Sequence, residues 1–139
     1  MKAVWWVLLF SYALGAQPWV LVGHPGSEVQ AMSAEEIRDI YLGRRHLIGN
    51  VRLIPLQLGA EDLLRRQFES EILQMSRPAL RAWWVRGHYL GQRPPRVVGS
   101  AAAVLAYVRQ VDGAVGYVPE TLVGDVNVTI LYHGGELLP

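Results

Sequence analysis

The chain has 139 residues, 51% of them hydrophobic and 18% charged, and its formal net charge is +1 from 13 Lys+Arg and 12 Asp+Glu. This length is enough for one domain, and the apolar fraction is enough to build a hydrophobic core. The balanced charge excludes a disordered solvating segment and the strongly basic character of a nucleic-acid-binding protein. No cysteine is present, which excludes disulfides, thiolate metal sites and a cysteine nucleophile.

Residues 1–16 have the pattern of a secretory signal. Lys2 precedes the apolar run 3–10, and the small-residue stretch 13–16 ends at Ala16, where we predict cleavage. The run is shorter than the roughly 20 apolar residues of a membrane span; an anchor and a buried first helix or strand are the alternatives. We therefore expect residues 17–139 to form a single soluble domain that is periplasmic or secreted. Without disulfides, this domain must be stabilised by its hydrophobic core alone.

The first half of this domain is predicted to contain a strand, a helix and a second strand. The apolar run 19–23 predicts a buried strand. Ser33 and Glu36 form a capping box that predicts a helix over 34–42, ended by Gly43. Residues 52–58 are expected to form a strand near an edge of the sheet, because Pro55 cannot donate a ladder hydrogen bond.

The second half is predicted to contain three helices and two strands. Helical spacing of apolar residues predicts a helix over 60–74, and Ser76 caps another that carries Trp83 and Trp84. We expect Phe68 and Trp84 to meet over the sheet. Residues 87–95 are expected to be a loop, Ser100 the start of a helix that stops at 112–113, and 114–118 and 126–132 the last strands. The predicted fold is α/β, with a central mixed sheet and helices on its faces.

Motifs for catalysis and metal binding are missing from the sequence. None of the four histidines lies on a predicted helix face with a second His, Asp or Glu at the i+3 or i+4 spacing. The pairs Glu35-Glu36 and Glu61-Asp62 lie in predicted first helical turns, where acids complement the helix dipole. There is no Gly-x-Ser-x-Gly elbow and no Walker-type loop. We therefore predict a non-enzymatic protein with no catalytic residue, no metal and no cofactor.

One segment is suited to binding an anion. Gly99-Ser100 opens a predicted helix shortly after Arg93 and Arg96, so free backbone N–H groups, a hydroxyl and two guanidinium groups would suit an oxyanion. The alternative is an ordinary N-cap beside solvated arginines.

Residues 20–118 resemble a known family. The stretches Ile-Tyr-Leu-Gly-Arg-Arg (40–45) and Asp-Gly-Ala-Val-Gly-Tyr-Val (112–118), together with Phe68, Trp84 and Pro94-Pro95, look like one lobe of the phosphate-binding proteins of ABC transporters, which have the type II periplasmic binding protein fold. Short, single-lobe, secreted relatives of these proteins are more similar still. The resemblance implies a fold of this kind and a role in binding a small oxyanion such as phosphate for an envelope transporter.

The resemblance also implies where phosphate would bind and how this chain departs from that pattern. The lobe should carry a Ser-Gly-Thr turn at a helix N-terminus, followed by Arg, and this turn falls on Asp62-Leu63-Leu64 with Arg65 retained. Glu61 and Asp62 place negative charge where the anion would lie. Two hypotheses follow: an oxyanion-binding protein that uses Arg65, Arg96, Gly99 and Ser100, or a non-enzymatic envelope module that has lost ligand binding and binds a partner protein.

Overall fold

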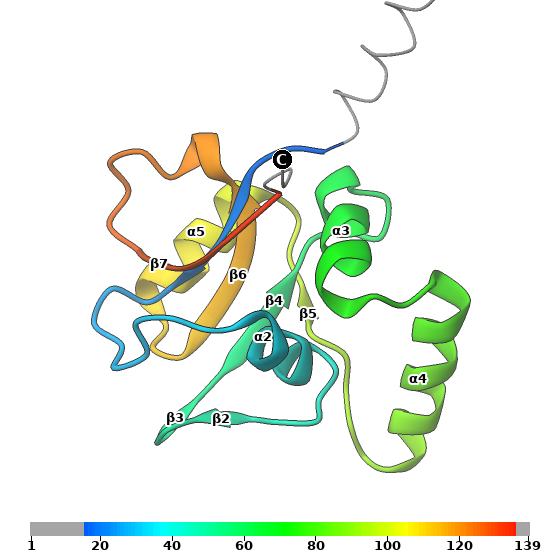
Figure 1. Cartoon of the computed structure of the whole chain (residues 1–139). Helices are drawn as coiled ribbons and strands as arrows, with labels where there is room; N and C mark the ends of the chain where they lie inside the picture. Colours follow the sequence, from blue (N-terminus) through cyan, green and yellow to red (C-terminus); the bar gives the residue numbers. More distant parts are fainter. Residues whose placement is uncertain (1–15, 136–139) are drawn as a thin grey trace, which may run out of the picture.

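The computed structural model describes residues 16–135, and its centre is a five-stranded mixed sheet in the order β5-β4-β6-β1-β7 (Figure 1). The neighbours β4, β5 and β6 are parallel, whereas β1 is antiparallel to both β6 and β7. This confirms the predicted mixed α/β architecture. The strands of the sheet are β1 (Trp19–Gly23), β4 (Ile54–Gln57), β5 (Arg96–Val97), β6 (Ala114–Pro119) and β7 (Thr129–Gly134).

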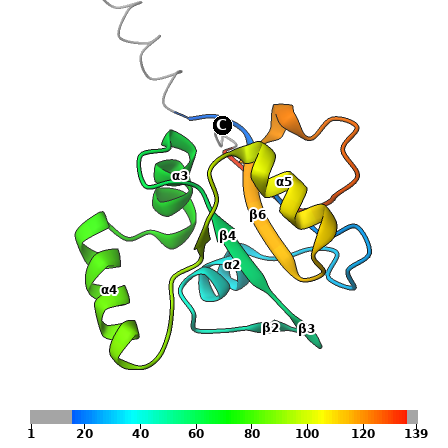
Figure 2. The same ribbon diagram turned by 180° about the vertical axis from the view of Figure 1, so that it is seen from behind.

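Helices cover both faces of the sheet, and a two-stranded hairpin lies beside it (Figures 1 and 2). The helices are α2 (Ala34–Tyr41), α3 (Leu63–Phe68), its π-helical continuation η1 (Glu69–Leu73), α4 (Arg77–Tyr89), α5 (Ala101–Gln110) and the 3-10 helix η2 (Glu120–Leu122); the hairpin strands are β2 (Leu47–Ile48) and β3 (Val51–Arg52). Within residues 16–135, no helix has the length and apolar composition needed to span a membrane.

An aromatic cluster holds α2 and α3 against one face of the sheet. Phe68 stacks on Tyr117 with a centroid distance of 4.2 Å, and it lies 4.7 Å from Tyr41 and 5.5 Å from Trp19. All four side chains are buried. The core on this face is therefore built by aromatic residues from β1, α2, α3 and β6.

The opposite face of the sheet is covered by α5, and Gly116 of β6 allows the close approach. Because neighbouring residues of a strand point to opposite faces, Gly116 faces α5 where Tyr117 faces the aromatic cluster. A Cβ at Gly116 would lie 2.5 Å from Cγ1 of Val104, which is itself fully buried. Glycine at this position of the Gly-Ala-Val-Gly-Tyr-Val stretch thus fixes the distance between helix and sheet.

Most predicted elements are present, with several differences. The edge strand β5 and the short helix η2 were not predicted, and residue 52 of the predicted strand 52–58 belongs to β3. The helix expected over 60–74 starts only at Leu63, because Asp62 is its N-cap, and it ends in π-helical turns. α4 runs through Gly87 to Tyr89 into the expected loop, since Gly87 packs beside Trp84. The last strand is Thr129–Gly134 in place of 126–132, and the hairpin β2–β3 was not predicted.

Two expectations about packing have different outcomes. Pro55 lies in β4, one strand from the edge, and the pairing with the two-residue β5 begins only after it, at Leu56; the prediction of a strand near the edge is confirmed. The predicted contact of Phe68 with Trp84 is wrong. Trp84 is half-buried on α4, next to Gly43 and Gln92, because α4 lies at the side of the sheet and does not cover its face.

Candidate oxyanion site at the carboxyl edge of the sheet

Two helices begin at the edge of the sheet where the parallel strands end. α3 follows β4 after the loop 58–62, and α5 follows β5 after residues 98–100. Figures 1 and 2 show α3 and the start of α5 near this same end of the sheet. Ligands of open α/β sheets bind outside the carboxyl ends of the strands, so this edge is the natural place for an anion.

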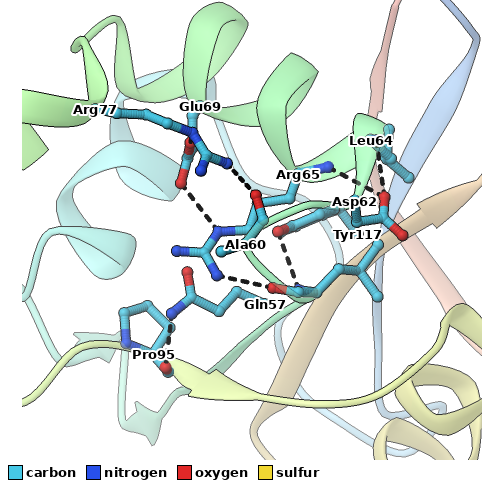
Figure 3. A network of polar contacts seen from close by, with 10 residues as sticks. Gln57, Ala60, Asp62, Leu64, Arg65, Glu69, Arg77, Pro95 and Tyr117 are labelled. Atoms are coloured by element: carbon cyan, nitrogen blue, oxygen red, sulfur yellow. Dashed lines mark hydrogen bonds and ion pairs between the residues drawn. The ribbon is translucent and has the colours of Figure 1, made fainter.

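The N-terminus of α3 is already occupied by a side chain of the chain itself. Oδ1 of Asp62 accepts hydrogen bonds from the backbone N–H groups of Leu64, at 2.8 Å, and Arg65, at 3.4 Å (Figure 3). Beside it, Glu61 accepts a hydrogen bond from Nη2 of Arg66 at 2.8 Å. The carboxylate of Asp62 thus takes the donors that the resemblance assigns to phosphate.

Arg65, a predicted ligand-binding residue, points into the molecule. Its Nε donates to Oε2 of Glu69 at 3.0 Å and its Nη1 donates to the carbonyl oxygen of Leu58 at 2.9 Å, and its side chain is only 18% exposed. Arg77 pairs with the other carboxylate oxygen of Glu69 at 3.5 Å and donates to the carbonyl of Ala60. Figure 3 shows these groups around the loop between β4 and α3. In this geometry both arginines hold that loop.

Two further side chains hold the end of β4, one to the first residue of this loop and one to the segment before β5. The hydroxyl of Tyr117 accepts a hydrogen bond from the N–H of Leu58 at 3.1 Å, and Nε2 of Gln57 donates to the carbonyl of Pro95 at 2.9 Å. Burial raises the pKa of Tyr117 far above its ordinary value, so its hydroxyl stays neutral at physiological pH. Sequence reasoning missed Gln57, Glu69 and Tyr117, although the i,i+4 spacing of Arg65 and Glu69 is a signal for their ion pair.

The start of α5 is open to solvent. Oγ of Ser100 accepts a hydrogen bond from the N–H of Ala103 at 3.1 Å, which confirms the predicted N-cap. Gly99 and Ser100 are exposed, and no atom lies within 4 Å of the place a Cβ of Gly99 would take. The first turn of α5 therefore has room for a small anion.

Arg96 does not point at this helix start. Its Nη1 donates to the hydroxyl of Tyr107 at 3.0 Å, and its guanidinium lies 5.7 Å from the ring centroid of Tyr107. Tyr107 is six residues beyond Ala101, or about 9 Å along the helix axis. The structure therefore brings Gly99 and Ser100 together, and it directs Arg96 along α5 and Arg65 into the β4–α3 loop. Arg93, the other arginine noted near this segment, lines a hollow beside α4.

The histidines do not form a metal site in the described part of the chain. No group of three or more His, Asp or Glu side chains within residues 16–135 is arranged to hold a metal ion. Nδ1 of His24 lies 3.0 Å from the carbonyl oxygen of Val108 and so joins the loop after β1 to α5.

Comparisons with known proteins identify the fold. No protein-family model and no curated protein sequence matches the chain. Similar solved structures include a protein of Clostridium perfringens assigned as a phosphate ABC transporter substrate-binding protein and solved with bound phosphate, with a TM-score of 0.67, 17% identity and coverage of 84% of this chain and 45% of that one. An ABC-type phosphate transport receptor from Vibrio cholerae has a TM-score of 0.63 and 17% identity, and covers 84% of this chain and 46% of its own.

A third similar structure is matched over a comparable share of its length. PstS from Borrelia burgdorferi has a TM-score of 0.64 and 11% identity, over 86% of this chain and 51% of its own. This chain thus spans about half the length of each of these proteins. The fold of residues 16–135 is that of one half of a phosphate ABC transporter substrate-binding protein.

Proposed function

We propose that this chain is a non-enzymatic, solute-binding-like protein that binds phosphate or another small oxyanion weakly, at the start of α5. The observation that carries the proposal is the exposed first turn of α5 at the carboxyl edge, where Gly99 leaves space and a neutral hydroxyl, that of Ser100, caps the helix in place of a carboxylate. Similarity to proteins named for phosphate transport supports the choice of ligand. The exposed Arg96 would contribute a guanidinium by turning from Tyr107 toward the anion.

The expected affinity is low. We expect the N-terminus of α3 to bind no anion because Asp62 caps it, and within residues 16–135 the start of α5 is exposed, so the ligand stays open to solvent there. An exposed anion keeps much of its hydration, and we expect a phosphate Kd no tighter than about 1 mM, or about −4 kcal/mol. Binding should weaken with added salt.

Calorimetric titration with phosphate, sulfate and nitrate tests this proposal. We expect Arg96→Ala to abolish binding, whereas Arg109→Ala, an exposed arginine near the far end of α5, should leave it unchanged. A micromolar affinity for phosphate that is insensitive to Arg96→Ala would contradict the assignment of the site.

A second variant tests whether the α3 site can be restored. Substituting Ser-Gly-Thr for all three residues 62–64 would also replace Leu64, which is buried, and would therefore disturb the core. Asp62→Ser alone keeps a capping hydroxyl and removes one carboxylate. We expect it to strengthen phosphate binding; unchanged binding would show that Asp62 is not what excludes the anion from α3.

We further infer that the protein is exported and works with an envelope transporter. Support for export comes from Lys2 and the apolar run 3–10, which lie outside the described residues. Cleavage near Ala16 is the expected outcome, and N-terminal sequencing of the protein recovered from the periplasm or medium measures it. An intact Met1 on a membrane-bound product would contradict the inference.

The second candidate function is an interaction module that has lost ligand binding. It is favoured by the Asp62 cap on α3 and by the inward direction of Arg65, since both leave the family's expected anion turn without free donors. A protein that shows no heat with any of the three oxyanions, and none after Asp62→Ser, would favour this function over the first.

A further inference from the structure

The outer face of α4 carries apolar side chains that the described fold leaves uncovered. One side of the helix is packed: Leu80 is buried, and Nε1 of Trp83 donates to the carbonyl of Leu42 at 2.9 Å. The other side presents Val85, Tyr89 and the following Leu90, which are 55%, 84% and 72% exposed. Figures 1 and 2 show α4 at one side of the molecule, away from the strands β1 and β7. Three large apolar side chains in and just after the last two turns of α4 are thus exposed to solvent.

The charged residues close to these side chains in the sequence are all arginines. No acidic residue occurs between Glu71 and Asp112, and this stretch of the sequence contains six of the chain's arginines. Within residues 16–135, five of these six arginines form no ion pair. Three of the five, Arg81, Arg86 and Arg93, lie on α4 or in the segment that follows it, close in the sequence to the apolar side chains.

Two shallow hollows combine these apolar and basic groups. One has a volume of about 810 Å³ and the other about 560 Å³, and both are lined by Arg81, Val85 and Tyr89. The larger hollow is also lined by Trp84, His88 and Arg93. No carboxylate lines either one, so the whole face favours an anionic partner with apolar parts.

We propose that the outer face of α4 docks on a membrane surface that contains anionic phospholipid. The helix is 13 residues long, or about 20 Å, so it can lie flat on a planar surface. Arg81 and Val85 are four residues apart, as are Val85 and Tyr89, and such residues lie on one face of the helix. The arginines contact lipid phosphates, and Val85, Tyr89 and Leu90 enter the boundary between headgroups and acyl chains. Basic helices with exposed aromatic and aliphatic side chains bind membranes in this way.

This binding is reversible and peripheral, and it is independent of the proposed oxyanion site at α5. The apolar contribution comes from a few side chains, and the electrostatic contribution is screened by salt. Docking through α4 would hold the module at the membrane where an envelope transporter resides.

Co-sedimentation with lipid vesicles tests the proposal on the protein as purified after export. Vesicles of phosphatidylcholine with about 30% phosphatidylglycerol represent an anionic surface, and pure phosphatidylcholine is the neutral control. We expect partitioning onto the anionic vesicles to be about tenfold stronger and to fall as salt is added. Equal partitioning onto both vesicles, or none onto either, would overturn the proposal.

Matched variants locate the surface. Val85→Asp and the double variant Arg81→Gln with Arg86→Gln should each lower partitioning about tenfold, because they remove an apolar contact or two phosphate contacts. Leu122→Asp on η2, where an apolar side chain is 47% exposed, and Arg109→Gln on α5 are the controls and should bind as the parent does. Circular dichroism verifies that each variant is folded. Parent-like partitioning of Val85→Asp would overturn the proposal.

A peptide control separates a lipid surface from an acidic protein. A synthetic poly-glutamate peptide is titrated into the parent and into the Arg81→Gln, Arg86→Gln variant. Peptide binding that depends on these arginines, without vesicle binding, would mean that the face takes an acidic protein segment and that the membrane proposal is wrong. Val85→Asp should give the parent's phosphate titration, so failure here is distinguishable from failure of the oxyanion site.

Discussion

At the scale of single residues, Phe68 and Trp84 differ in how deeply their side chains are buried, which their size and helical spacing do not reveal. Phe68 is 1% exposed and contacts three aromatic rings in the centre of the molecule. Trp84 lies half-buried on α4 beside Gly43. The two side chains therefore contribute differently to stability, although the sequence alone predicts equal contributions.

We expect Phe68→Ala to lower the free energy of unfolding by about 3–5 kcal/mol, because it leaves a cavity between Tyr41 and Tyr117. Trp84→Ala should cost less, about 1–2 kcal/mol, since this side chain is only partly buried and lies outside the central core. Urea unfolding of both variants measures the difference. Equal losses would mean that α4 is packed more tightly than the structure indicates.

At the scale of elements, the junction between β4 and α3 depends on a buried carboxylate. Glu69 is 7% exposed and pairs with Arg65 at 3.0 Å and Arg77 at 3.5 Å. Through these arginines it connects the π-helical segment η1 to the carbonyl groups of Leu58 and Ala60. The ion pairs thus set the position of the loop at the carboxyl edge.

Glu69→Gln should lower the free energy of unfolding by roughly 2 kcal/mol, less than the 3–5 kcal/mol of a fully buried pair, because Arg65 and Arg77 keep some access to water. Glu61→Gln, which removes an exposed carboxylate from an exposed pair, is the control and should change stability by less than about 1 kcal/mol. Thermal unfolding measures both variants. Equal effects would show that the buried network does not stabilise the junction.

At the scale of the whole molecule, two buried tyrosines couple stability to alkaline pH. Burial raises the pKa of both Tyr41 and Tyr117 above the ordinary value of 10.0, and the neighbouring Tyr117 raises the pKa of Tyr41 further. A group whose pKa is higher in the folded state contributes stability that is complete below its unfolded pKa and is lost as pH rises toward the folded pKa.

We therefore expect the contribution of these tyrosines to be constant between about pH 7 and pH 9 and the Tm to fall above about pH 10. Tyr41→Phe should reduce the alkaline slope, at the cost of the hydrogen bond that its hydroxyl donates to the carbonyl of Leu56 at 2.8 Å. Tyr107→Phe, outside the cluster, is the control and should keep the parent's slope. A parent-like slope in Tyr41→Phe would contradict this assignment.

The sequence by itself determined the features that depend on local patterns. The capping box at Ser33 and the N-caps at Ser76 and Ser100 set three helix starts, and the apolar run 19–23 set a buried strand, because each is encoded by residues that are neighbours in the chain. The order of strands and helices along the chain, which indicates a mixed α/β fold, was likewise determined by local patterns. So was the presence of Asp62 in place of the expected anion-binding turn.

Only the tertiary structure decided which side chains meet across the sheet. Arg65 and Arg96 look equally available in the sequence, yet Leu58 and Glu69 hold the first and Tyr107 contacts the second. Trp84 has the spacing of a core residue, yet α4 lies at the side of the sheet. These outcomes depend on where β4, β5 and their helices are placed in space, and periodicity reports which face of an element is apolar without specifying what covers it.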